Sequence, residues 1–434
     1  MKQLTRLFIP ICLETLFYML SGMVDTLMLS AVGDYAVGAV GTANSYIGIF
    51  IIMFSIISSG MVSVMTQNIG AGRPGVAYQA RQLGLLFNAV AGVLMAVFLF
   101  SGAGAILRMV GIADALYEPA LIYLKIVGGG CILNAVIPIF SSYLRAFGYT
   151  KQPLYATIVG NIANFVMNAV FLFILHKGVA GVATATVTSK ILNLCIVLYF
   201  SHKLISAKNS TERIANKTVL GQIVKVGLPS ACETALYNVA MMLVIRFLNQ
   251  MDAEGLNVTA RSYTATISNF SYCVGAALAQ ANAIMTGWHI GAGELEECDR
   301  GTKRAAFVGV CVAVCMETAI VLGSGFIMPL FTDNPEMTAL VRKLLAIDIV
   351  LEIGRVTNLV FGQALKTSGD AVFPAVIAAV FMFVFAVGGT WLFGISMGLM
   401  AVGAYIGLAS DECVRAVGMV WRWKTGKWRT KKLV

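Results

Sequence analysis

Twelve apolar runs follow one another along this chain, and each is long enough to cross the roughly 30 Å hydrocarbon core of a bilayer as an α-helix. Their approximate limits are 7–31, 38–66, 83–107, 121–146, 153–175, 179–200, 220–249, 259–287, 305–330, 339–365, 371–393 and 396–421. Of the 434 residues, 58% are apolar and 12% are charged, whereas soluble domains contain about 45–50% and 25%. The sequence therefore predicts an all-α polytopic membrane protein with twelve transmembrane helices.

Positive charge is concentrated in alternate connections between these runs. The formal net charge of +10 would suggest nucleic-acid binding in a soluble protein, but Lys and Arg crowd one set of connections and are sparse in the other. The crowded set is Arg73 and Arg81; Arg145 and Lys151; Lys203 to Lys217; Arg300 to Arg304; Lys366; and the tail 422–434. By the positive-inside rule we expect both termini in the cytoplasm. The basic tail is interpreted as a topology and lipid-surface anchor, with no nucleic-acid partner.

Signals of covalent or metal chemistry are weak in this sequence. Nine cysteines are scattered, nearly all inside predicted helices, so we expect no disulfides. The sequence has no zinc-ligand spacing, phosphate loop or nucleophile elbow. An intramembrane enzyme would need a nucleophile with its base or a set of metal ligands. We therefore expect that the chain is not an enzyme and uses no cofactor.

The chain repeats itself at a nearly constant offset. The repeated segments are Ile9-Pro10, Glu14-Thr15 and Tyr18 with Leu228-Pro229, Glu233-Thr234 and Tyr237; Ile69-Gly70-Ala71-Gly72 with Ile290-Gly291-Ala292-Gly293; and Leu144-Arg145, Gly148 and Pro153 with Leu365-Lys366, Gly369 and Pro374. Because six helices per half is an even number, both halves should insert in the same orientation, related by an axis along the membrane normal. The expected organisation is an N-lobe at 1–205, a cytoplasmic linker at 206–218, a C-lobe at 219–421 and a basic tail at 422–434.

The first apolar run carries two carboxylates, Glu14 and Asp25. A charged side chain at the centre of a membrane helix costs about 2.5–3.5 kcal/mol on insertion scales, so such residues indicate a site. At about 100° per residue both acids share one helix face with Tyr18. Glu14 has a twin in Glu233, but Asp25 maps to Val244, so only the first half carries the deeper acid.

Three asparagines lie on the fifth predicted helix, Asn161, Asn164 and Asn168. Asn164 and Asn168 are one turn apart on one face, with Asn161 beside them. For any single asparagine the alternative is an interhelical hydrogen bond, worth about 0.6–2 kcal/mol. Combined with Asp25, the pair indicates the lining of a small-cation or proton site.

Charged residues also gather on three predicted helices of the second half. The helix at 220–249 carries Glu233 and Tyr237, and two further helices carry Asp348, Glu352 and Arg355, and Asp411, Glu412 and Arg415. Buried arginines must be neutralised, so the simplest interpretation is a set of structural ion pairs made by Arg355, Asp411, Glu412 and Arg415. The candidate lining of a substrate cavity is Glu233, Tyr237, Asp348 and Glu352, with Tyr18 and Asn161 from the first half.

Several motifs together carry a family resemblance. They are Ile9-Pro10, Val24-Asp25-Thr26, Gly33…Ala39-Val40-Gly41, Ile69-Gly70-Ala71-Gly72, the turn from Leu144 to Gly148, Asn164, Leu228-Pro229…Glu233, and the ending Asp411-Glu412…Arg415…Trp421-Arg422-Trp423-Lys424…Trp428. In order, spacing and duplication the chain resembles the multidrug and toxic compound extrusion (MATE) family over essentially its whole length, and within it a bacterial branch related to NorM-like transporters. The resemblance implies a plasma-membrane monomer with two six-helix lobes around a cavity, from which cationic, amphipathic small molecules leave in exchange for Na⁺ or H⁺.

The resemblance also implies roles for single residues. Asp25 matches the acid of the family's N-lobe, Asn164 its helix-five asparagine, and Glu233 the acid of its C-lobe. The family often has Asp where Asn168 stands, which removes one charge from a possible Na⁺ site at Asp25. Arg355 stands at the helix-ten position that is Asp in Na⁺-coupled relatives, which weakens the expectation of a C-lobe cation site of the usual kind. These two departures favour H⁺ as the coupling ion.

The expected function is secondary active antiport by rocker-type alternating access. Desolvation disfavours a charged carboxylate, so Asp25 is expected to alternate between a protonated or cation-bound state and an ionised state that admits substrate. Glu14 is expected to relay the ion or serve substrate, and Glu233 to supply counter-charge across the cleft. The alternative is a flippase or exporter of a lipid-linked or other metabolite within the same superfamily. A receptor or purely structural role would leave the acids in both halves unexplained.

Overall fold

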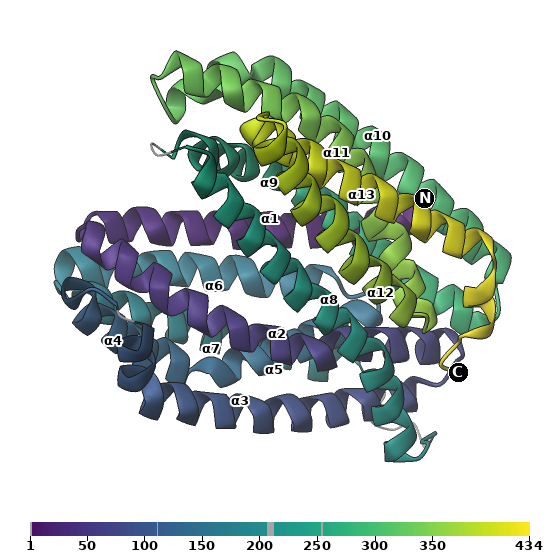
Figure 1. Cartoon of the computed structure of the whole chain (residues 1–434). Coiled ribbons are helices and arrows are strands. Elements are labelled where there is room, and N and C mark those ends of the chain that lie inside the picture. Colours follow the sequence, from purple (N-terminus) through teal and green to yellow (C-terminus); the bar gives the residue numbers. More distant parts are fainter. Residues whose placement is uncertain (1, 111, 206–211, 253–254) are drawn as a thin grey trace. The chain divides into compact units, whose positions relative to one another are not determined.

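The computed structural model describes residues 2–110, 112–205, 212–252 and 255–434, which form helices with short connections and contain no β-strand (Figure 1). The elements are α1 (Lys2–Ser30), α2 (Asp34–Gly70), α3 (Pro74–Val110), α4 (Asp114–Gly129), α5 (Cys131–Ala146), α6 (Lys151–Ala169), η1 (Val170–Ile174), α7 (Gly178–Leu204), α8 (Asn216–Met251), α9 (Leu256–Ala292), α10 (Leu295–Ile327), η3 (Met328–Leu330), α11 (Pro335–Ser368), α12 (Val372–Phe381), η4 (Met382–Val387), η5 (Thr390–Ser396), α13 (Met400–Lys424) and η6 (Lys427–Thr430). Residues 206–211 of the linker expected at 206–218 lie outside the described residues.

The chain divides into two compact units. The N-unit is Ile9–Gly227, and the C-unit is Leu228–Val434 together with the N-terminal residues through Phe8. Both boundaries fall inside helices, next to Pro10 of α1 and Pro229 of α8. Proline removes one backbone hydrogen bond and permits a helix to bend, so the repeated Pro marks the same place in both halves.

Each unit contains six long helical segments among the described residues. They are α1, α2, α3, α4 with α5, α6 with η1, and α7 in the N-unit, and α8, α9, α10, α11, α12 with η4 and η5, and α13 in the C-unit. Eight helices are long and apolar enough to cross a membrane, or nine if α4 and α5, bent by 41°, count as one span. The remaining long helices, α9, α11 and α13, are the more polar ones. The all-α, twelve-segment fold predicted from the sequence is confirmed.

The repeated Gly turns have the same backbone geometry in both units. Gly148 and Gly369 follow α5 and α11 with φ of 85° and 97°, a left-handed conformation that favours glycine. In both turns the residue after the glycine donates its backbone N–H to the carbonyl five residues earlier. Tyr149 donates to Leu144 at 2.9 Å, and Asp370 donates to Leu365 at 3.0 Å. Each helix therefore ends in a Schellman-type cap, which satisfies backbone groups that would otherwise be left without partners.

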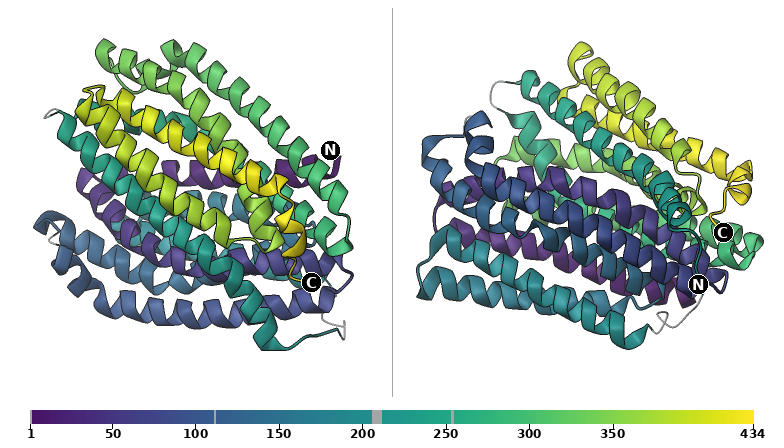
Figure 2. Two further views of the ribbon diagram at one scale, coloured as in Figure 1. Left: turned by 45° about the vertical axis from the view of Figure 1, so that its right-hand side comes forward. Right: turned by 90° about the horizontal axis from the view of Figure 1, so that it is seen from below.

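The C-unit packs α9, α10, α11 and α13 side by side (Figure 2). A Cβ atom added to Gly354 of α11 would lie 2.7 Å from the backbone nitrogen of Cys413 in α13, so only glycine allows this close backbone approach. The approach brings the residue after it, Arg355, beside Glu412 of α13. A small residue in α11 thus positions the charged residues described below.

Both units carry a π-helical stretch in their fifth long segment. In the N-unit α6 continues into η1 directly after Asn168 and Ala169, and in the C-unit α12 continues into η4 and η5. The π-helix, with its i→i+5 hydrogen bonds, is rare in proteins and is found most often at functional sites. The N-unit stretch begins two residues after the asparagine that contacts Asp25.

Candidate cation and substrate sites

Asp25 of α1 lies beside the two asparagines of α6 that share its face. The Asn168 Nδ2 group donates to Asp25 Oδ1 at 2.8 Å and to Asn164 Oδ1 at 3.1 Å. Asn164 and Asn168 are 5% and 0% exposed, so these amides are out of contact with solvent. The Asn168 Oδ1 atom is buried without a hydrogen-bond partner among the described residues. Amide oxygens and a carboxylate are the ligands that hard cations prefer, so the group offers a coupling ion the right chemistry.

A cation missed by the sequence analysis lies near this group. Lys190 of α7 donates from Nζ to Asn134 Oδ1 at 2.8 Å, and its charge acts on Asp25. Tyr123 of α4 also lies close to Asp25. The signal in the sequence was a lone Lys within the apolar run 179–200, and such a residue needs a counter-charge. Lys190 and Asp25 together make the buried polar group of the N-unit nearly neutral.

The other candidates of the N-unit have different partners. Glu14 forms an ion pair with Arg145 of α5, with 2.5 Å between Oε1 and Nη2. Asn161 donates to the Phe17 carbonyl at 2.9 Å, and Tyr18 is 71% exposed. Glu14 therefore faces a cation at the end of the fourth long segment, about three turns from Asp25 along α1.

Glu233 makes the equivalent ion pair in the C-unit. Its carboxylate lies 2.8 Å from Nζ of Lys366, and Lys366 is the repeat of Arg145 just as Glu233 is the repeat of Glu14. Each unit thus contains one ion pair between the start of its first long segment and the end of its fourth. The sequence contained both members of each pair, but the linear motifs alone did not indicate that they meet.

A cavity of about 460 Å³ lies within the C-unit. Its lining is Glu233, Thr234, Tyr237, Met241, Arg261, Ala265, Ser268, Asn269, Tyr272, Asp348, Leu351, Arg355, Asn358, Leu359, Gln363, Lys366, Met382, Tyr405, Leu408, Asp411, Glu412 and Arg415. The mixture of aromatic, thioether and charged side chains suits small organic ions, and methionine adapts to ligands of different shape. Of the C-unit candidates, Glu233, Tyr237 and Asp348 line this cavity, whereas Glu352 does not.

Two arginines of the cavity wall are held by acids from α11 and α13. Arg415 lies 2.7 Å from Asp411 and 2.8 Å from Glu412. Arg355 pairs with Glu352 one turn earlier in α11 and lies 3.7 Å from Glu412. All three acids are less than a tenth exposed, so each charge depends on its partner rather than on water.

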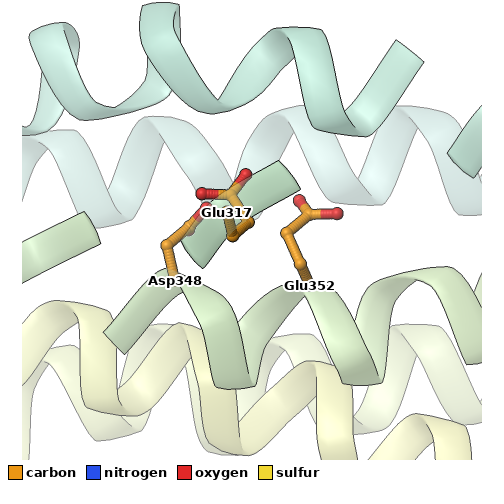
Figure 3. A group of neighbouring side chains, drawn as sticks. All are labelled: Glu317, Asp348 and Glu352. Atoms are coloured by element: carbon orange, nitrogen blue, oxygen red, sulfur yellow. The ribbon is translucent and has the colours of Figure 1, made fainter. Parts of the chain in front are cut away.

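A third helix contributes an acid that the sequence analysis left without a role. Glu317 of α10 is fully buried, and its carboxylate faces Asp348 and Glu352 of α11 (Figure 3). One oxygen from each of these three residues lies within 4.8 Å of the others. The signal in the sequence was a single Glu within the apolar run 305–330.

Comparison with known proteins shows the family of the chain. The sequence matches the family model described as MatE over residues 10–170 and 229–392. It is 32% identical over 428 residues to "Uncharacterized transporter YisQ" of Bacillus subtilis, covering 97% of this chain and 94% of that protein. It is 20% identical over 446 residues to "Probable multidrug resistance protein NorM" of Thermotoga maritima, covering 100% and 94%.

Solved structures show the same fold at low sequence identity. A structure of MATE in the straight conformation matches with a TM-score of 0.88 and 21% identity, over 99% of this chain and 96% of that one. A MOP superfamily transporter from Pyrococcus furiosus matches with a TM-score of 0.84 and 20% identity, over 99% and 96%. The latter structure is described as having a binding pocket of reversed polarity that suggests a different function.

Proposed function

Because the chain belongs to the MatE family and is a multi-pass transporter of the plasma membrane, not an enzyme, we propose that it exports cationic, amphipathic compounds in exchange for H⁺ or Na⁺. One relative carries the name of a probable multidrug resistance protein, which supports this substrate class. The observation that carries the proposal is the partly buried contact of Asp25, the one acid of this group, with the amide of Asn168.

Asp25 is the coupling residue in this proposal. Asn168 and Lys190 stabilise the ionised carboxylate of Asp25. When Asp25 takes up a proton or a cation, its attraction for these two side chains becomes weaker. A ligand shifts an equilibrium between conformations by its differential affinity for them, so ion binding at Asp25 biases the N-unit toward one access state. Both termini face the cytoplasm in the proposed topology.

The orientation of the Asn168 amide supports H⁺ over Na⁺. Its N–H group, and not its oxygen, faces Asp25, and a donor satisfies a carboxylate without a metal ion. A bound Na⁺ would require the amide oxygen at that position instead. The nearby Lys190 charge also competes with a metal cation for the same carboxylate.

The C-unit cavity is the proposed binding place for the cationic compound. Tyr237 and Tyr272 supply aromatic faces, which attract organic cations by cation–π interaction. Asp348 supplies a carboxylate that forms no ion pair among the described residues. Glu233 is engaged by Lys366, so it serves the substrate only when that pair opens.

Transport by purified protein in liposomes tests the proposal. Release of ethidium is measured under an imposed pH gradient and, separately, under an imposed Na⁺ gradient, for the wild type, for Asp25→Asn and for the exposed control Asp333→Asn. We expect efflux driven by the pH gradient, its loss in Asp25→Asn, and wild-type efflux in the control. Coupled efflux at the wild-type rate in folded Asp25→Asn protein would refute the role of Asp25, and a response to Na⁺ alone would refute H⁺ coupling.

A second candidate function is export of an anionic, lipid-linked or other metabolite. The observation that favours it is a set of cations in the cavity wall: Arg261, Arg355, Lys366 and Arg415. Arg261 forms no ion pair within the described part of the chain, so it is available to an anionic group. If carboxyfluorescein is transported and ethidium is not, and Arg261→Gln abolishes that transport, this second function replaces the first.

A further inference from the structure

The starting point is the meeting of three carboxyl groups inside the C-unit. Glu317 comes from α10, and Asp348 and Glu352 come from successive turns of α11 (Figure 3). Their exposed fractions are 0%, 2% and 0%. Three carboxylates this close repel one another strongly in a medium of low dielectric, so the group is stable only with added positive charge.

Hydrogen bonds leave much of this group unsatisfied. Neither oxygen of Glu317 accepts a hydrogen bond from the described residues, and the same holds for Asp348 Oδ2 and Glu352 Oε2. A buried carboxylate without partners is destabilising unless a proton or another cation neutralises it. Glu317 is therefore a fully buried acid that faces two others and has no ion-pair partner among the described residues.

Neutral oxygen atoms surround the same point. Ser271 and Ser268 of α9 lie next to Glu317 and Asp348, respectively. Both hydroxyl oxygens are buried and have no hydrogen-bond partner by geometry within the described residues. Two serines thus add neutral oxygen atoms next to two of the three carboxyl groups, and carboxylate and hydroxyl oxygens are the ligand chemistry of hard cations.

The arginines nearby pair with only one acid of this group, Glu352. Arg415 is engaged by Asp411 and Glu412, and Arg355 by Glu352 and Glu412. Among the described residues, Glu317 and Asp348 form no salt bridge. Two carboxylates therefore remain without a paired cation after the guanidinium groups have been assigned.

We propose that Glu317, Asp348 and Glu352, with Ser268 and Ser271, bind one hard metal cation of the size of Na⁺ or Ca²⁺. Such an ion takes oxygen ligands at about 2.3–2.6 Å, so ligands on opposite sides of it are about 4.6–5.2 Å apart. The three carboxylate oxygens lie within 4.8 Å of one another, so one ion can contact all three. A divalent ion balances both unpaired carboxylates, and Na⁺ balances them together with one proton.

The ion reaches this site from the cavity, because Asp348 lines the cavity and also belongs to the site. Glu352 connects the site to the cavity wall, since it belongs to the group of three acids and also pairs with Arg355, which lines the cavity. Occupancy therefore changes how strongly Glu352 holds Arg355. The site is separate from Asp25, and its existence does not depend on the substrate proposed above.

Direct binding to the purified, detergent-solubilised protein tests this inference. Radioactive ²²Na⁺ and ⁴⁵Ca²⁺ are titrated separately in choline chloride buffer onto the wild type, Glu317→Gln, Asp348→Asn and Asp25→Asn. Glu336→Gln is the matched control, since Glu336 is an exposed glutamate on the same helix, α11. We expect one of the two ions to bind saturably, and its affinity to fall by roughly tenfold or more in Glu317→Gln and in Asp348→Asn. Asp25→Asn and Glu336→Gln should retain this binding.

Thermal unfolding of the same variants provides the second measurement. In cation-free buffer Glu317→Gln should be at least as stable as the wild type, because the substitution removes a buried charge without a partner. Addition of the bound ion should raise the Tm of the wild type and of Asp25→Asn, but not that of Glu317→Gln. Unchanged isotherms in folded Glu317→Gln and Asp348→Asn would overturn the proposal, as would the absence of saturable binding of either ion. Loss of binding in Asp25→Asn alone would place the ion in the N-unit and also overturn it.

Discussion

Asp25 in the N-unit and Asp348 in the C-unit are both acids of membrane helices, yet their surroundings differ in kind. Asp25 contacts the neutral amide of Asn168, with Lys190 close by. Asp348 lies among Glu317 and Glu352, and the arginines nearby are occupied by other acids. The polar group of the N-unit contains one acid with one nearby cation, whereas the C-unit holds a network in which each charge depends on several others.

The scaffold around these acids is nevertheless shared. Glu14 with Arg145 and Glu233 with Lys366 form equivalent ion pairs in the two units. The caps at Gly148 and Gly369 are equivalent as well. Duplication thus preserved the parts that shape each unit, while the buried polar groups diverged.

The largest expected effect is the loss of Arg415 from the C-unit network. Arg415→Met leaves Asp411 and Glu412 buried without this partner, and such a loss costs about 3–5 kcal/mol. Unfolding in mixed dodecylmaltoside and SDS micelles measures the change. The exposed Arg342 of the same unit provides the control Arg342→Met, which should lose less than about 0.5 kcal/mol. Equal losses in the two variants would show that the network contributes no stability.

Next in size is the close approach of α11 and α13. Gly354→Ala places a methyl group 2.7 Å from a backbone atom of α13 and should cost about 1–3 kcal/mol. Gly362→Ala on the same helix is the matched control, because the nearest atom to its added Cβ lies at 3.8 Å. The control should be neutral or slightly stabilising, since alanine favours helices. The same unfolding assay compares them, and a cost in both would remove the special role of Gly354.

A third change makes the N-unit resemble the C-unit. Asn168→Asp places a second carboxylate beside Asp25, and two acids attract a cation more strongly than one acid with an amide. In a Glu317→Gln background, which removes the proposed C-unit ion site, we expect the affinity of the N-unit for Na⁺ to rise by about tenfold, which corresponds to about 1.4 kcal/mol. Binding of ²²Na⁺ is measured with Asn161→Asp as the control, since Asn161 donates to a backbone carbonyl instead. A similar gain in both variants would mean that added charge alone explains the effect.

The smallest expected effect concerns the repeated ion pairs. Glu14→Gln and Glu233→Gln should each cost about 0.5–1 kcal/mol, because both pairs are partly exposed. Exchange of the charges, with Glu14→Arg and Arg145→Glu together, should recover most of the loss in the N-unit. The free energy of unfolding is measured for the wild type and these three variants. Unequal costs of Glu14→Gln and Glu233→Gln would show that the two pairs have different roles.

The sequence was sufficient for the fold because hydrophobic length and duplication are linear signals. The spacing within one helix also predicted that Asn164 and Asn168 share a face, because residues four apart lie on the same side of a helix. This is the face that meets Asp25. Contacts between helices could not be predicted from helical spacing. Glu317 stands alone in its helix and acquires partners only when α10 packs against α11. The pairing of Glu14 with Arg145 likewise depends on how α1 and α5 pack, although both residues recur in the repeat.

The π-helical stretch η1 has a consequence for insertions and deletions. A π turn takes up one residue more than an α turn, so the chain carries a surplus residue within Val170–Ile174. Deletion of Phe171 would convert the stretch to α-helix and leave Asn164 and Asn168 in register with Asp25. The same deletion placed before Asn164 would turn both asparagines by about 100° away from that acid. A one-residue deletion in this helix is therefore expected to be tolerated after Asn168 but not before Asn164.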